Sequence, residues 1–205
     1  PLAMPYFALS ELGFVRDIAT TELLKLELKD FLTTPAENWM YGTLSNVFRG
    51  QYWSEHVAFP GIIAVFLALS AFISTRDKSL SPSDKLVKNR SLIWGYGVVF
   101  LITIILALGA TFNIPGTNIF IPMPFKRLFN HVPGFQGLRT PSRFIIVSML
   151  ALAVLSGIGL SWLQTWWQKG TWTNKSPAYT GKTILIILIS ILALEYLSAP
   201  TPFVR

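Results

Sequence analysis

The sequence predicts an all-α membrane protein, a polytopic helix bundle with about four transmembrane helices and extracytoplasmic loops. Of its 205 residues, 52% are hydrophobic and only 13% are charged, whereas a soluble domain carries about a quarter charged residues. The hydrophobic residues also gather into four segments close to the roughly 20 residues that cross a bilayer. Four buried helices of a soluble core are the alternative, but a spanning helix needs no polar face and these segments show none.

The predicted spans cover residues 57–75, 92–112, 144–165 and 183–200. Only the fourth contains a charged residue, Glu195, which lies near its end. An acid inside a membrane is a functional hypothesis by default, although exposure to water at a helix end explains Glu195 equally well. The small residues of Gly95 to Gly97 and Ser156 to Gly159 would allow close contacts between helices.

Charge in the connecting loops sets the expected orientation. Loops 76–91 and 166–182 are short and basic, as cytoplasmic loops are, and tryptophans around the second suit an interfacial aromatic belt. Residues 1–56 hold seven acids and four bases and are expected to be extracytoplasmic. Both ends of the chain are then outside, with 201–205 starting an external tail. We expect the chain to be the C-terminal half of a longer protein.

The external segments contain two expected short helices. In residues 1–56, "ELGFVRDIATTELLKLELKDFL" has apolar residues near a helical period and predicts an amphipathic helix, followed by the turn chemistry of "TTPAENWMYG". In loop 113–143, prolines and glycines argue against a long helix, but "MPFKRLFNHV" predicts one short amphipathic helix on the membrane surface. Its expected lipid-facing residues are Phe125, Leu128, Phe129 and Val132.

Loop 113–143 breaks the charge pattern, because it holds four bases and no acid on the side expected to be external. The bases are Lys126, Arg127, Arg139 and Arg143. Snorkelling and headgroup contact are one explanation. The other is an anion site, because arginine binds phosphate through two parallel hydrogen bonds.

The segment around Pro141 predicts how two of these arginines are presented. Proline disfavours helical geometry in the residue before it, so Leu138 to Thr140 should be extended. Pro141 itself suits the first turn of the third predicted span, where its missing N–H costs nothing. Arg139 and Arg143 then flank the positive end of a helix at headgroup depth.

Sequence motifs give little direct evidence of catalysis. The chain contains no GxGxxG, P-loop, CxxC or HExxH pattern, and its only histidines are His56 and His131. Glu55 and His56, which are adjacent in the sequence, are weak catalytic candidates. A lone histidine is more often an interfacial hydrogen-bonding residue than a catalyst. No cofactor or metal site is evident. Nucleic acid is not an expected partner, because the basic residues are scattered between apolar runs.

Four stretches resemble the YfhO-like and related GT-C-type bacterial membrane glycosyltransferases. The most specific is "FQGLRTPSRFIIVSMLALAVLSGIGL". The others, in matching order, are "ELGFVRDIATTELLKLELKDFLTTPAENWMYG", "YWSEHVAFPGIIAVFLALSAF" and "LEYLSAPTPF". Together they cover nearly the whole chain, and they identify the family better than an activity.

The resemblance implies a glycosyltransferase that uses a polyprenyl-phosphate-linked sugar at the outer face of the bacterial plasma membrane. Arg139 and Arg143 are the best matches for binding the lipid phosphate, with Lys126 and Arg127 next. Such enzymes usually keep a catalytic acid in an earlier external loop, so Glu55 is the one acid here worth testing. A divalent metal would belong to the full-length enzyme.

Two other classes of function remain open. The chain could be a non-catalytic transmembrane scaffold or accessory subunit, with other membrane subunits as partners. A transporter or channel is the weaker option, because polar groups inside the spans are nearly absent.

Overall fold

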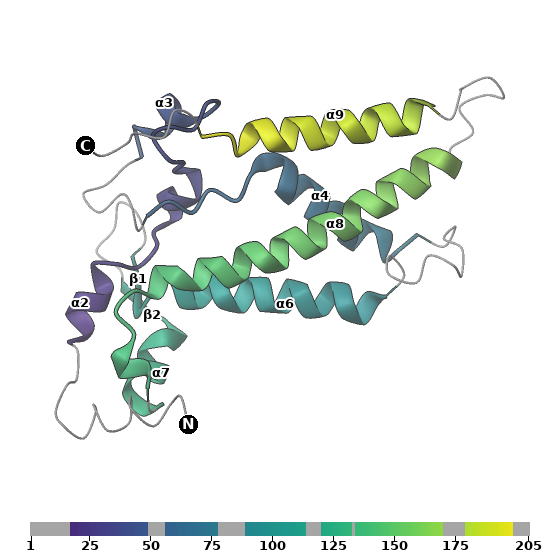
Figure 1. Cartoon of the computed structure of the whole chain (residues 1–205). Helices are drawn as coiled ribbons and strands as arrows, with labels where there is room; N and C mark the ends of the chain where they lie inside the picture. Colours follow the sequence, from purple (N-terminus) through teal and green to yellow (C-terminus); the bar gives the residue numbers. More distant parts are fainter. Residues whose placement is uncertain are drawn as a thin grey trace, which may run out of the picture. The chain divides into compact units, whose positions relative to one another are not determined.

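The computed structural model describes residues 17–48, 56–77, 89–113, 120–132, 134–169 and 179–198 (Figure 1). The chain is mostly helical and its contacts divide into two compact units. Unit 1 comprises Pro1–Thr33, Val47–Phe59 and Leu101–Ser148, and unit 2 comprises Thr34–Asn46, Pro60–Phe100 and Met149–Arg205.

Four apolar helices dominate the fold. They are α4 (Ile62–Ser74), α6 (Arg90–Ala107), α8 (Ile145–Lys169) and α9 (Tyr179–Glu195). Two stretches in the described part are long and apolar enough to cross a membrane, Arg90–Ala107 and Pro141–Trp167. Two shorter apolar helical stretches cover Ile62–Ser74 and Leu185–Glu195.

The helix expected over residues 57–75 begins later than predicted. It starts at Ile62, after Pro60 and Gly61, whose φ of 80° lies outside helical geometry. Its 13 residues extend for about 20 Å at 1.5 Å per residue, less than the roughly 30 Å of a hydrocarbon core. The helix expected over 92–112 similarly ends at Ala107, beyond which Gly109 adopts a φ of 77°.

Unit 2 has a core of small and branched side chains from α4, α6 and α8, with Leu192 of α9 packed against it. The predicted close contacts of Ser156 to Gly159 are confirmed. The Ser156 hydroxyl donates to the Ala64 carbonyl at 2.7 Å, and Gly159 lies directly against the Leu67 carbonyl of α4. Backbones approach closely here because glycine has no side chain to separate them.

Unit 1 is built from short elements. They are α2 (Ile18–Glu22), η1 (Leu28–Leu32), β1 (Thr111–Asn113), β2 (Phe120–Pro122), α7 (Pro124–His131), η3 (Phe135–Gly137) and η4 (Pro141–Phe144). Strands β1 and β2 pair antiparallel, with Phe112 opposite Ile121. Unit 1 also includes the end of α6 and the start of α8, where the Thr103 and Ser148 hydroxyls lie 2.6 Å apart.

The long amphipathic helix expected between residues 11 and 32 is wrong for the described part of that segment. Only α2 and the 3-10 turn η1 are helical. The backbone and side chains between them form hydrogen bonds with distant parts of the chain instead of the hydrogen bonds of a helix. The Leu26 N–H donates to the Ala107 carbonyl at 2.9 Å, and the Lys25 ammonium donates to the Thr111 carbonyl at 2.5 Å. A helix through this stretch would lose both contacts.

Glu22 joins α2 to the turn that follows α6. One carboxylate oxygen accepts from the backbone N–H groups of Ala110 and Thr111 at 2.8 and 3.0 Å. The other accepts from the Thr111 hydroxyl at 2.6 Å and from the Lys25 ammonium at 2.7 Å. Residues of the predicted external segments 1–56 and 113–143 also meet within unit 1, where the Ser142 N–H donates to the Leu24 carbonyl at 3.3 Å.

Candidate functional site

The basic turn, defined as residues 138–144, follows the predicted geometry. Leu138 is extended, with φ −74° and ψ 115°, and Pro141 occupies the first position of η4, which leads directly into α8. Both arginines of the turn, Arg139 and Arg143, are exposed. The extended approach and the proline start of a helix are thus confirmed, and the positive groups are presented at the surface of unit 1.

Helix α7 carries the other two candidate bases. The predicted helix is confirmed, with Lys126 and Arg127 both exposed. The expectation that its apolar face meets lipid is wrong for Phe125 and Phe129, which are 0% and 5% exposed within a protein cluster that includes Phe144. An amphipathic pattern shows that one face is apolar, but it does not show what covers that face.

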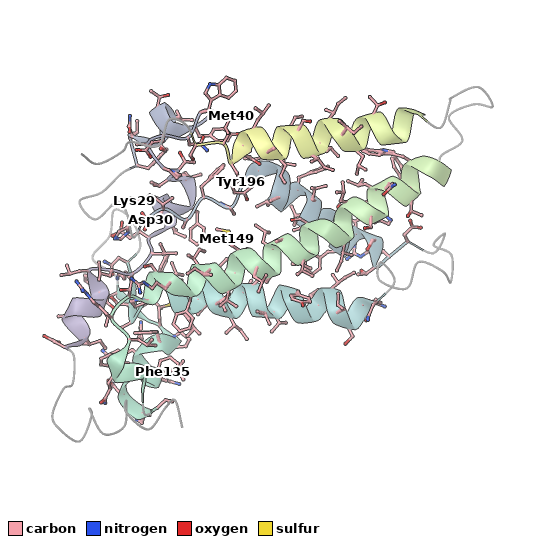
Figure 2. All side chains as sticks on the ribbon, viewed as in Figure 1. Lys29, Asp30, Met40, Phe135, Met149 and Tyr196 are labelled. Carbon is pink, nitrogen blue, oxygen red and sulfur yellow. The ribbon has the colours of Figure 1, made fainter. Side chains whose placement is uncertain are left out.

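Aromatic packing places α7 and the basic turn in one cluster. The Phe125 ring lies edge-on to Phe135 and Phe144, with centroid separations of 6.1 and 6.5 Å. Figure 2 shows Phe135 beside α7. Lys126 follows Phe125 and Arg143 precedes Phe144 in the chain, so the cluster anchors the backbone on which both bases are carried.

The segment that follows α2 contacts the basic turn and fixes its backbone. The Ser142 N–H donates to the Leu24 carbonyl at 3.3 Å, and Pro141 and Ser142 are both buried. The Ser142 hydroxyl is buried without a hydrogen-bond partner among the described residues. Buried polar groups are nearly always paired, so this hydroxyl is unusual.

His56, one of the weak catalytic candidates, is paired with a buried acid that the sequence did not indicate. Its ring Nδ1 lies 2.7 Å from Asp30 Oδ2, and the two side chains are 13% and 1% exposed. Asp30 Oδ2 also accepts from the Glu27 N–H at 2.7 Å, and the Asp30 carbonyl accepts from the Ala58 N–H at 3.2 Å. The hydrogen bond that the Asp30 carboxylate accepts raises the pKa of His56 above its usual value, whereas burial lowers it.

Sequence reasoning missed Asp30 because it lies 26 positions from His56. It belongs to no recognisable motif and counted only as one acid of an acidic segment. The available local signal was its place three residues after Glu27, where it completes a capping box at the start of η1. The other weak candidate, Glu55, lies outside the described residues.

Glu195, in unit 2, is buried and not exposed to water. Its carboxylate accepts from the N–H groups of Ile62 and Ile63 at 2.6 and 3.1 Å, which are the first donors of α4. The segment before α3 (Gly42–Ser45) completes the contact, because the Asn38 amide donates to the Glu195 carbonyl at 2.8 Å. Figure 2 shows Tyr196 at this end of α9, where its hydroxyl donates to the Pro60 carbonyl at 2.6 Å. Glu195 therefore has a structural role as the N-terminal cap of α4.

Across the described ranges, no group of three or more histidine or acidic side chains is arranged to hold a metal ion. In comparisons with known proteins, no family model, no curated protein and no solved structure matches this chain.

Proposed function

We propose that this chain is part of an integral glycosyltransferase of the bacterial plasma membrane, and that it uses a polyprenyl-phosphate-linked sugar at the outer face. The observation that carries the proposal is the basic turn with its neighbour α7. Four cationic side chains are exposed on these two elements, which the aromatic cluster around Phe125 holds together in unit 1. Glycosyl transfer from such a donor leaves a lipid phosphate that gains negative charge, and fixed cations stabilise that charge.

The proposed membrane arrangement has four spans with both chain ends outside. Two of the four helices, α6 and α8, lie in stretches that are long and apolar enough to cross a membrane, and the shorter helix α4 pairs with α9. Glu195, at the C-terminal end of α9, caps the N-terminal end of α4. The capped backbone groups suit an apolar surrounding, because hydrocarbon offers no other acceptor for the first N–H groups of a helix.

The alternative is a non-catalytic scaffold or accessory subunit of a membrane complex, and a separate observation favours it. Three buried ionisable residues, Lys25, Asp30 and Glu195, all hold backbone segments in place. That is the pattern of structural polar groups. A scaffold would bind neither a lipid phosphate nor a sugar donor.

Equilibrium binding of undecaprenyl phosphate separates these two functions. With the full-length protein in phosphatidylcholine nanodiscs, we expect Arg139→Gln and Arg143→Gln each to weaken binding. The loss should be about 1.5–3 kcal/mol, or roughly 10- to 150-fold, because a charge-assisted hydrogen bond is removed. Insertion into the membrane should be unchanged.

Arg90→Gln is the matched control, because Arg90 is an exposed arginine at the start of α6 and lies in the other unit. Its affinity should equal that of the parent protein. Parent-like binding by both turn variants would refute the phosphate site, and failure of the parent to bind undecaprenyl phosphate would favour the scaffold.

A further inference from the structure

His56 and Asp30 form a carboxylate–histidine pair in which the two ring nitrogens have contacts of different lengths. Nδ1 faces the Asp30 carboxylate at 2.7 Å. Nε2 has a longer contact of 3.4 Å with the Leu23 carbonyl. In such pairs the acid fixes the orientation of the ring and leaves Nε2 to exchange a proton with a substrate.

This pair lies next to the basic turn. Leu23 contacts the histidine through its carbonyl, and Leu24 accepts from the backbone of Ser142 in the turn. These leucines are consecutive, with Cα atoms about 3.8 Å apart. The pair and the turn are thus attached to the same short stretch of backbone within unit 1.

Two buried polar atoms in this region have no hydrogen-bond partner in the described structure. They are Oδ1 of Asp30 and the hydroxyl oxygen of Ser142, in residues that are 0% and 2% exposed. An unsatisfied buried group destabilises the folded state, and a catalytic role is one reason why a protein keeps such a group. One of these unpartnered atoms belongs to the His56–Asp30 pair, and the other belongs to the basic turn.

We propose that His56 is the general base of the glycosyl transfer and that Asp30 is its positioning residue. This inference rests on the proposed function, because it adds a proton acceptor beside the phosphate site. Its acceptor substrate is a hydroxyl group, as on a glycan or glycolipid of the outer face. Neither residue is assigned to phosphate binding.

The reaction balances without a further reagent. Nε2 of neutral His56 takes the proton of the acceptor hydroxyl while that oxygen bonds to the anomeric carbon of the donor sugar. The bond from the anomeric carbon to the phosphate oxygen breaks, and its electron pair leaves with the polyprenyl phosphate. Arg139 and Arg143 stabilise the charge gained by the phosphate, and His56 later releases its proton to water.

The pair also determines how the rate depends on pH. The hydrogen bond to the Asp30 carboxylate raises the pKa of His56 and burial lowers it, while the negative charge of Asp30, the Leu23 carbonyl and the negative charge of Glu27 raise it further. A base must be neutral to act, so the rate should rise as the pH passes upward through this raised pKa. Removing the Asp30 charge should move that rise to lower pH.

The test uses membranes that contain the full-length protein and a radiolabelled undecaprenyl-phosphate hexose, with loss of label from the lipid as the readout. We expect His56→Gln to lower kcat by about 100-fold or more, the usual contribution of a general base, with the KM for the lipid unchanged. In Asp30→Asn the rise in kcat/KM should shift to lower pH. His131→Gln is the control, because His131 is an exposed histidine of α7, and it should behave as the parent.

His56→Gln leaves the buried Asp30 carboxylate without its histidine partner, so the double variant Asp30→Asn/His56→Gln guards against loss of folding. It should be inactive and still bind undecaprenyl phosphate. Parent-like kcat in this double variant, or an unmoved pH profile in Asp30→Asn, overturns the inference and leaves the proposed function standing. A parent that binds the lipid phosphate but transfers no sugar overturns both.

Discussion

Replacing Gly159 with alanine should strongly destabilise the protein. A Cβ at this position would overlap the Leu67 carbonyl oxygen and the Ser70 hydroxyl of α4. The first of these is a backbone atom that no rotamer change can move aside. Overpacking typically costs 1–3 kcal/mol, and we expect about 3 kcal/mol or more here, measured by thermal or denaturant unfolding in detergent.

Gly157 provides the matched control on the same helix. A Cβ built there meets nothing within 4 Å, so Gly157→Ala should be neutral or stabilising by up to about 1 kcal/mol, because alanine favours helix. Equal stabilities for Gly157→Ala and Gly159→Ala would contradict the close packing of α4 on α8.

Replacing Glu195 with alanine should have the second large effect. The substitution removes the acceptor for the N–H groups of Ile62 and Ile63 and leaves them without their cap. Each of the two donors left without an acceptor costs about 1–3 kcal/mol, so the free energy of unfolding should fall by roughly 2–6 kcal/mol. The site cannot easily relax, because Gly61 has a φ of 80° and lies against Tyr196.

Glu195→Gln tests whether the capping oxygen or merely the side-chain volume is responsible. Glutamine keeps one acceptor oxygen and the same length, so it should lose clearly less stability than alanine. If the glutamine and alanine variants unfold at the same temperature as the parent, Glu195 is not the cap of α4.

The sequence was sufficient to locate the four apolar helices, because a long uncharged apolar run is compatible with few structures other than a helix. It could not place their ends. The start of α4 depends on Gly61 and on a carboxylate 133 positions from Ile62. Glu195 could be read equally well as exposed or functional, because a sequence does not show which backbone groups an acid will meet.

The candidate site was predictable to a similar degree. The chemistry of proline identified the extended approach to Pro141 and the start of the helix that carries Arg143. The partner of His56 was not predictable, because Asp30 reaches it only through tertiary contacts. The orientation of α7 was misread for the same reason, since Phe125 packs against residues distant in sequence.

The proposed function requires α7 and the basic turn to lie on the outer face of the membrane. Labelling of introduced cysteines tests this location most directly. These 205 residues contain no cysteine, so each introduced thiol in them reports one position. With an impermeant thiol reagent on intact cells, Asn130→Cys on α7 should be labelled, because Asn130 is exposed. Ser81→Cys and Ser176→Cys, in the basic loops, should react only after the membrane is opened. Labelling of Ser81→Cys and Ser176→Cys with protection of Asn130→Cys would invert the topology and contradict a phosphate site at the outer face.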